Sequence, residues 1–357
     1  MKSTVEMLTE LMACHAMTSN VEGVNKAMEV MKGFAEAEGL YTTVEDFNGR
    51  HAMFVATVPG KEVDFLLNAH LDVVVVPSED MFIPKVDGDI IRGRGVSDDQ
   101  GAAICALKVM AALKGRASVG TIFTADEEHG GSTTGGMVNR GYKGRKIGLI
   151  IDGPAYGVAV AQKGIITLHL RAHGVSGHSS RPWSFQNAID RLIDGYLKFR
   201  AVWPVVTEAD QWHNTMAATV INGGNPASTN QIPNVAEMTL NIRYTKEEDY
   251  EKIVEQAKEL TGLEIVTTPH HCQPMYTDEK DPLIQKLMDN MRKAFPDHEI
   301  KTSRMNGATD ARHLVKMGIP LGIIGLPGGD AHGPNEWQSL SGLEKYAELL
   351  TNFIAEQ

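Results

Sequence analysis

The sequence predicts an α/β protein with a mostly parallel sheet flanked by helices and an inserted βαββαβ domain. Short apolar runs of strand length alternate with helical patterns over the first 162 residues, which is typical of a parallel sheet covered on both faces. After about residue 162 the order changes to β-α-β-β-α-β, a unit that can fold on its own. The length of 357 residues suits two domains. We therefore expect a large domain interrupted by a smaller, lid-like one.

The first part of the chain begins with two helical patterns. Residues 1–20 are amphipathic, with Glu6 and Glu10 inside the apolar pattern, so they predict a helix and not a signal peptide. The next predicted elements are a helix, two strands, a helix and two strands, at 24–40, 51–58, 63–69, 101–113, 119–125 and 147–151. In such sheets ligands bind at the carboxyl ends of the strands.

The inserted domain has its own pattern of elements. The predicted strands lie at 164–172, 216–222, 236–244 and 264–268. One helix carries Ile189, Leu192 and Ile193 on one face, and another covers 246–260. A helix at 283–295 and a buried strand at 321–326 then return to the large domain. The predicted domains are 1–162 and 270–357 for the large one and 163–269 for the lid-like one.

Composition excludes several classes of protein. The chain has 34 Lys+Arg and 45 Asp+Glu, a net charge of −11, and no basic patch that would favour nucleic acid. Three separated cysteines argue against a disulfide framework. No apolar run is long enough to span a membrane. We expect a cytoplasmic protein that binds neither nucleic acid nor a membrane.

Acidic residues and histidines recur where predicted strands end. The motifs are His70-Leu71-Asp72, Gly93-Arg94-Gly95 leading to Asp98-Asp99-Gln100-Gly101, Asp126-Glu127-Glu128, Asp152 and Ala331-His332-Gly333-Pro334-Asn335-Glu336. Any one of these acids alone is usually a turn residue or a helix cap. Together at one sheet edge they would repel one another unless cations were bound. Imidazole and carboxylate without thiolate suit Zn, Co or Mn, and five ligands exceed what one tetrahedral zinc requires. Two metal ions sharing one carboxylate fit the count.

These motifs, in this order, resemble the signature of the M20 family of di-zinc metallopeptidases. That family includes aminoacylases, acetylornithine deacetylases, succinyl-diaminopimelate desuccinylases, glutamate carboxypeptidases and di- and tripeptidases. The resemblance covers nearly the whole chain and specifies the family far better than the substrate. Gln100 is a departure, because many members carry lysine there.

The resemblance implies a role for each residue of the motifs. Asp98 would bridge two divalent metal ions, zinc first with cobalt or manganese as alternatives, and a cis peptide often follows this residue in the family. Glu128 and His332 would complete one metal site, and His70 and Asp152 the other. Glu127 would be the general base. Asp72 would orient His70.

The inserted domain extends the resemblance. Residues 174–182 and 187–189 resemble the lid segment whose histidine, here His178, contacts the substrate carbonyl. Asn230 and Arg243 lie in segments that resemble those holding the substrate carboxylate. From the residues alone, His178 could equally be a functional residue or a solvated loop histidine. Arg243 could equally be a functional residue or a surface cation. The segment 307–312 resembles a family segment near the substrate pocket, with no role assigned. In dimeric members the lid histidine reaches the partner's active site, so we expect a homodimer.

The predicted function is metal-assisted hydrolysis of the amide bond of a small N-acyl amino acid or a short peptide with a free carboxylate. A di- or tripeptidase of the same family is one alternative. A catalytically silent binding protein on the same scaffold is another, although neither a ligand nor the base is missing. A metal-dependent nuclease is disfavoured by the net charge of −11.

Overall fold

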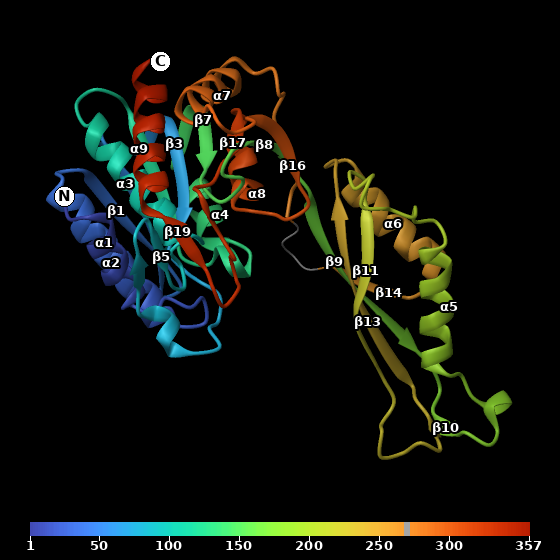
Figure 1. Ribbon diagram of the computed structural model, residues 1–357. Helices are drawn as coiled ribbons and strands as arrows, with labels where there is room; N and C mark the ends of the chain where they lie inside the picture. The colour runs from blue at the N-terminus through green and yellow to red at the C-terminus, as the bar shows by residue number, and fades with distance from the viewer. Residues whose placement is uncertain (268–271) are drawn as a thin grey trace. The chain divides into compact units, whose positions relative to one another are not determined.

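The computed structural model describes residues 1–267 and 272–357, and these divide into two compact units (Figure 1). Unit 1 comprises 1–161, 275–304 and 309–357, and unit 2 comprises 162–274 and 305–308. The predicted boundary between 269 and 270, and the end of the strand predicted at 264–268, lie outside the described residues. The return of 305–308 to unit 2 has no signal in the sequence pattern.

Unit 1 is built on a nine-stranded mixed sheet, which confirms the predicted fold class. At its centre β6, β3, β7 and β17 are parallel neighbours, whereas β1, β2 and β8 join the sheet antiparallel. The strands are β1 (Tyr41–Phe47), β2 (Arg50–Ala56), β3 (Glu62–His70), β6 (Val119–Thr124), β7 (Lys143–Ile150), β8 (Gly157–Gln162), β15 (Met275–Tyr276), β16 (Lys301–Met305) and β17 (Leu321–Ile323).

Helices pack against this sheet, whose strands direct successive side chains to opposite faces. In β3, Phe65 and Leu67 join one apolar cluster with helices α1, α2, α3, α7 and α9, while Leu66 between them points to the opposite face. Helix α4 packs on β1, β2 and β6 and contacts α8. The helices are α1 (Thr4–Met12), α2 (Val21–Ala37), α3 (Gln100–Leu113), α4 (Ser132–Asn139), α7 (Pro282–Ala294), α8 (Ala311–Leu314) and α9 (Leu340–Ala355), with 3₁₀ turns η1 (Glu79–Phe82), η2 (Glu127–His129) and η4 (Val315–Met317).

A second, four-stranded sheet joins the two ends of unit 1. Its order is β18-β19-β5-β4, so a segment near residue 90 pairs with one near residue 338. The strands are β4 (Lys85–Asp87), β5 (Ile90–Arg92), β18 (Gly328–Gly329) and β19 (Trp337–Ser339).

Unit 2 has an antiparallel sheet in the order β11-β13-β9-β14, with α5 and α6 packed together and α5 lying on β9 and β13. Its elements are β9 (Gly164–His173), β10 (Gly177–His178), η3 (Pro182–Ser184), α5 (Ala188–Arg200), β11 (Thr215–Gly223), β12 (Gln231–Ile232), β13 (Val235–Tyr244), α6 (Asp249–Thr261) and β14 (Glu264–Thr267). Apart from the short pair β10–β12, this is the predicted βαββαβ order. Among the described residues of both units, no helix has the length and apolarity that crossing a membrane requires.

Candidate metal centre

The carboxyl ends of the parallel strands of unit 1 carry the predicted site residues. His70 ends β3, η2 with Glu127 and Glu128 follows β6, and Asp152 follows β7. Because parallel strands end at the same edge, side chains far apart in sequence meet there. Asp98 reaches this edge from the bend before α3. His332 reaches it from the loop between β18 and β19.

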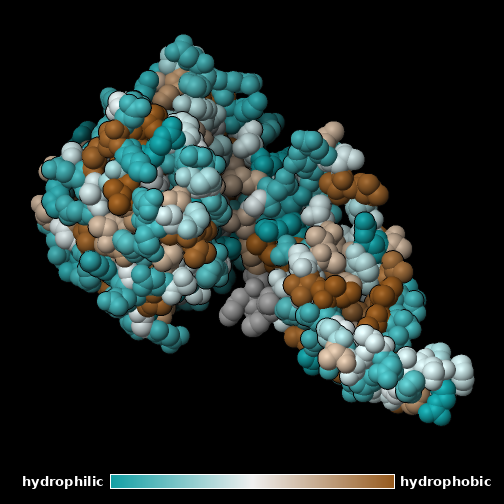
Figure 2. All heavy atoms as spheres, turned by 60° about the horizontal axis from the view of Figure 1, so that its bottom comes forward, coloured by the Kyte–Doolittle hydropathy of each residue, from teal (hydrophilic) through white to brown (hydrophobic). Residues whose placement is uncertain are grey.

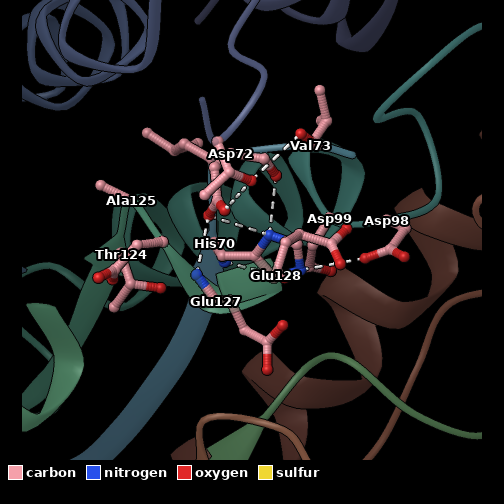
Figure 3. A network of polar contacts seen from close by, with 12 residues as sticks. His70, Asp72, Val73, Asp98, Asp99, Thr124, Ala125, Glu127 and Glu128 are labelled. Atoms are coloured by element: carbon pink, nitrogen blue, oxygen red, sulfur yellow. Dashed lines mark hydrogen bonds and ion pairs between the residues drawn. The ribbon is translucent and has the colours of Figure 1, made fainter. Parts of the chain in front are cut away.

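The carboxylate of Asp98 lies between two histidines. Its Oδ1 is 3.0 Å from His70 Nε2, and its Oδ2 is 3.0 Å from His332 Nε2. His332 Nε2 also lies 3.1 Å from Glu128 Oε1. Figure 3 shows His70 between Asp72 and Asp98, with Glu128 beside it. The peptide bond between Asp98 and Asp99 is cis, as the resemblance implies.

Two groups of residues in this cluster have the spacing of a metal site. His70, Asp98 and Glu128 form one, and His70, Glu127 and Asp152 form the other, with ligand atoms within 4.8 Å of one another in each. His332 belongs to neither group, but its Nε2 lies 3.0 Å from Asp98 and 3.1 Å from Glu128, so all five predicted ligands lie close together. The groups differ from the expectation in two other respects, because the residue common to them is His70 and not Asp98, and because Glu127, the predicted base, is in the second group. Asp98 nevertheless turns one oxygen toward each histidine, which suits a shared carboxylate.

Asp72 contacts His70 chiefly through its backbone carbonyl. His70 Nδ1 is 2.9 Å from the carbonyl oxygen of Asp72 and 3.5 Å from its carboxylate Oδ1. The carboxylate instead accepts hydrogen bonds from Thr18 Oγ1 at 2.8 Å and from the backbone N–H of Glu127 at 3.2 Å. The second of these bonds links Glu127 to the residue that contacts His70, while the contact of Nδ1 with the Asp72 carbonyl leaves Nε2 of His70 directed at Asp98.

Three carboxyl groups of the cluster, those of Asp152, Glu127 and Glu128, have raised pKa values. Burial and the neighbouring Asp98 raise the pKa of Asp152 to about 8. Burial also raises the pKa of Glu127 and of Glu128, with Asp152 adding to the first effect and Asp98 to the second. The hydrogen bond to Asp98 raises the pKa of His332 to about 9. Without cations, the raised pKa values favour neutral carboxyl groups at Asp152, Glu127 and Glu128 and a positively charged His332, so the set of donors fits divalent metal ions.

We expect the metal-free protein to lose stability as pH rises from 6 to 9. Asp152 has a folded-state pKa of about 8 against an ordinary 3.8, so its penalty grows through this range and is complete above pH 8. The contribution of His332 is complete below its ordinary pKa of 6.5 and disappears as pH passes about 9, which has the same sign. Scanning calorimetry of chelated protein should show a Tm about 5 °C lower at pH 9 than at pH 6. A Tm that stays constant or rises with pH would contradict this expectation. Adding metal back should reduce the dependence of Tm on pH.

Several buried partners of the cluster were not predicted. Arg312 donates from Nη2 to Glu127 Oε1 at 2.7 Å and to the Glu127 carbonyl at 3.0 Å. Asp310, two residues earlier, accepts from Thr124 Oγ1 at 2.8 Å and from Thr134 Oγ1 at 2.5 Å. The resemblance of segment 307–312 was a signal for this region, although it gave these residues no role.

The three predicted residues of unit 2 fall into two places. His178 pairs with Gln231 across the β10–β12 ladder, and the backbone N–H of Ser179 donates to the Asn230 carbonyl at 2.9 Å. Arg243 lies near the other end of β13, where it pairs with Ile165 and its Nε donates to Asn241 Oδ1 at 3.2 Å. The structure therefore brings His178 and Asn230 together but separates them from Arg243.

Comparison with known proteins identifies the family. A family model described as peptidase family M20/M25/M40 matches residues 66–356. A probable succinyl-diaminopimelate desuccinylase of Staphylococcus aureus (strain MRSA252) is 24% identical, over 98% of this chain and 96% of that protein. A succinyl-diaminopimelate desuccinylase of Rickettsia africae (strain ESF-5) is 25% identical, over 99% of both chains.

Solved structures share the fold at low sequence identity. An M20 metallo-carboxypeptidase from Sulfolobus solfataricus has a TM-score of 0.79 at 16% identity, covering 99% of each chain. The aminopeptidase PepT from Bacillus cereus has a TM-score of 0.76 at 18% identity, covering 99% of this chain and 98% of that one. A dinuclear metal-binding M20 peptidase from Bacillus subtilis has a TM-score of 0.68 at 13% identity, covering 99% and 98%. The family model spans most of the chain, and the chain therefore belongs to the M20/M25/M40 peptidase family of hydrolases.

Proposed function

We propose that this protein hydrolyses the amide bond of a small N-acyl amino acid or short peptide that carries a free carboxylate, with two divalent metal ions bound. The observation that carries the proposal is the cluster in which Asp98 faces both His70 and His332 beside the buried Glu127. Relatives named as desuccinylases and a neighbour named as a carboxypeptidase support this class of substrate.

The residues that would hold the metals follow from the cluster. Asp98, Glu128 and His332 would hold one ion, and His70, Asp152 and the shared Asp98 the other, with zinc preferred over cobalt or manganese. Bound ions would supply Lewis-acid chemistry, polarising a carbonyl oxygen and lowering the pKa of a water molecule.

Glu127 is the proton carrier of the proposed reaction. Its carboxylate would accept the proton of the attacking water and then deliver it to the leaving amine. The bond from Arg312 Nη2 to Oε1 keeps this side chain in one orientation, because both residues are buried and the same Nη2 also donates to the Glu127 carbonyl. A carboxylate held in this way can receive the proton without reorganisation.

His178 is suited to donate to the developing oxyanion. The backbone N–H of Ser180 donates to His178 Nδ1 at 3.2 Å, and Ser180 Oγ lies 2.8 Å from the same nitrogen. Because a backbone N–H can only donate, Nδ1 is an acceptor and the proton of neutral His178 sits on Nε2. Arg243, with its planar fork, and Asn230 would bind the substrate carboxylate.

The geometry of unit 2 argues that a second copy completes the site. Val235 pairs with His173 and Arg243 with Ile165, so β13 separates the His178 end from Arg243 by eight residues, about 26 Å of extended strand. An acylated amino acid or dipeptide spans only about 7–10 Å. One copy of unit 2 therefore cannot place His178 and Arg243 on the same substrate. We infer a homodimer in which the partner supplies His178 and Asn230.

Unit 2 also offers a surface for such pairing. Strand β11 is an edge of the sheet, and Val220 and Ile221 on it are half exposed. Ile193 and Leu197 expose apolar side chains on α5, and unit 2 shows apolar patches in Figure 2. An exposed edge strand beside apolar helix residues favours pairing with another chain.

Mixing two inactive variants should restore activity if His178 acts in trans. Glu127→Gln and His178→Ala chains would form heterodimers with one intact composite site of two, so each heterodimer should have about half of the wild-type dimer's activity. Each variant mixed with itself is the control. Subunit exchange is followed with differently tagged chains, and exchange without recovery would place His178 in its own chain's site or in a structural role.

A substrate panel tests the proposed reaction. Chelated protein restored with Zn, Co or Mn should hydrolyse at least one class among N-acetyl amino acids, N-succinyl amino acids, dipeptides and tripeptides. Preference for an acylated amino acid over peptides would separate deacylase from di- or tripeptidase. Binding without hydrolysis of any member, with two metals bound, would identify the silent binding protein instead.

A further inference from the structure

A buried ion pair joins the two loops that carry Asp98 and His332. Arg94 Nη1 and Glu336 Oε2 are 2.9 Å apart, and the two side chains are 1% and 0% exposed. The residues are 242 positions apart in the sequence. Neither of them belongs to the proposed ligand set or touches the proposed base in the described contacts. A buried pair of this kind pays a desolvation cost, and apolar residues of similar size often give equal stability. Stability alone therefore does not account for this pair.

Glu336 holds the loop that leads to Asp98. Its Oε1 accepts from the backbone N–H groups of Ser97 at 2.9 Å and Asp98 at 3.0 Å. Its Oε2 accepts from the N–H of Gly95 at 3.0 Å as well as from Arg94. Both oxygens are thus used twice, and the N–H of Asp98 itself is fixed by a charged acceptor.

Arg94 holds the loop of His332 in the same way. Its Nη2 donates to the carbonyl oxygens of His332 at 3.2 Å and Gly333 at 3.1 Å. His332 has a φ of 64° and Asp330 a φ of 55°, a left-handed conformation that non-glycine residues adopt infrequently. The two carbonyl contacts fix the backbone that makes this conformation, so they determine where the His332 ring can point.

We propose that Arg94 and Glu336 are a positioning pair of the metal centre, which sets the distance between Asp98 and His332. This inference rests on the proposed function, since it concerns the affinity of the two-metal site. One ion pair fixes five backbone groups on two loops, and the side chains of those loops meet at 3.0 Å between His332 Nε2 and Asp98 Oδ2. Breaking the pair alters none of the five ligand side chains and keeps the β5–β19 pairing beside it, but it removes the side-chain bonds that position the loops of Asp98 and His332.

Glu336→Gln is the sharpest test. The amide keeps the size of the side chain but replaces one carboxylate oxygen with an NH₂ group. In the wild-type protein that oxygen accepts two hydrogen bonds, whereas the NH₂ group can only donate. We expect metal affinity to fall 10- to 100-fold, the range seen when partners of metal ligands are changed. Affinity is measured on metal-free protein by competition with a chromophoric chelator for Zn²⁺ and Co²⁺. The visible spectrum of the Co²⁺ form should change as well. With excess metal, kcat should recover partly while KM stays near the wild-type value.

Two further variants separate positioning from stability. Arg94→Lys keeps the charge but loses the fork that binds Glu336 and the two carbonyls together, so it should give an intermediate loss of affinity. Met31→Ala removes a buried side chain from α2, which packs on α1, β1 and β2, and should lower Tm without changing metal affinity.

Each outcome decides the proposal. A metal affinity of Glu336→Gln within twofold of the wild-type value would overturn it. The proposal would also be overturned if Met31→Ala lost as much metal affinity as Glu336→Gln at the same fall in Tm. If Glu336→Gln does not fold, the affinity of Arg94→Lys decides in its place. A wild-type protein that binds no metal would instead refute the proposed function.

Discussion

Glu127→Gln is expected to lower kcat by about 100- to 10,000-fold while two metal ions per chain remain bound. Glutamine has the size of glutamate but cannot accept the proton of the attacking water, and none of the five proposed ligands is altered. The Arg312 contact to Oε1 can be kept by the amide oxygen, so the side chain should stay in place. Initial rates and elemental analysis of the same preparation measure both quantities.

The neighbouring carboxylate provides a matched control. Glu128→Gln removes a proposed ligand one residue away, so it should lower metal content as well as kcat. The two variants need to be compared because the structure also groups Glu127 with His70 and Asp152 at the spacing of a metal site. Loss of a metal ion in the Glu127→Gln variant would identify Glu127 as a ligand. Near-normal turnover would assign the proton transfer to another group.

Asp98→Ala is expected to abolish activity and to remove both metal ions. Its two carboxylate oxygens lie 3.0 Å from His70 and from His332, which belong to different proposed metal sites. Loss of a carboxylate common to both sites should weaken both, whereas Asp152→Ala should empty only one. Elemental analysis under a defined excess of zinc should therefore give fewer than one ion for the first variant and about one for the second.

The reverse pattern would point to a different arrangement. If Asp98→Ala keeps one ion, the carboxylate serves a single site. If it keeps two, Asp98 is not a ligand. Loss of both ions from Asp152→Ala would favour a centre organised around His70, the residue common to the two groups in the structure.

The sheet was predictable where its strands carry periodic or continuous apolar patterns. The runs at 63–69 and 119–125 correspond to β3 and β6, and the helix expected at 101–113 is α3, Gln100–Leu113. The small sheet β18-β19-β5-β4 was not predicted, because strands of two or three residues show no periodicity. The antiparallel attachment of β1, β2 and β8 depends on pairing between strands, which sequence alternation does not specify.

Residues of the candidate site were predictable where a side chain of a metal-ligand type comes directly after a predicted strand. His70, Glu128 and Asp152 were predicted as ligands because each follows an apolar run and is of a ligand type. Arg94 and Glu336 stood in recognised motifs, yet they act on backbone N–H and carbonyl groups, which have no sequence signature. Thr18 and Arg312 act through contacts with residues 54 and 185 positions away, so only the fold reveals them.

The position of β17 affects the order in which the protein can fold during synthesis. This strand, Leu321–Ile323, lies between β7 and β8 in the sheet, although the whole main segment of unit 2 is made before it. A nascent chain therefore completes the 162–274 segment while the main sheet of unit 1 still lacks an inner strand. His332 emerges later still, so the acidic edge receives its last histidine only after β17 has been made. The acidic residues of this edge are therefore made before the imidazole of His332, which contacts Asp98 and Glu128 in the folded chain.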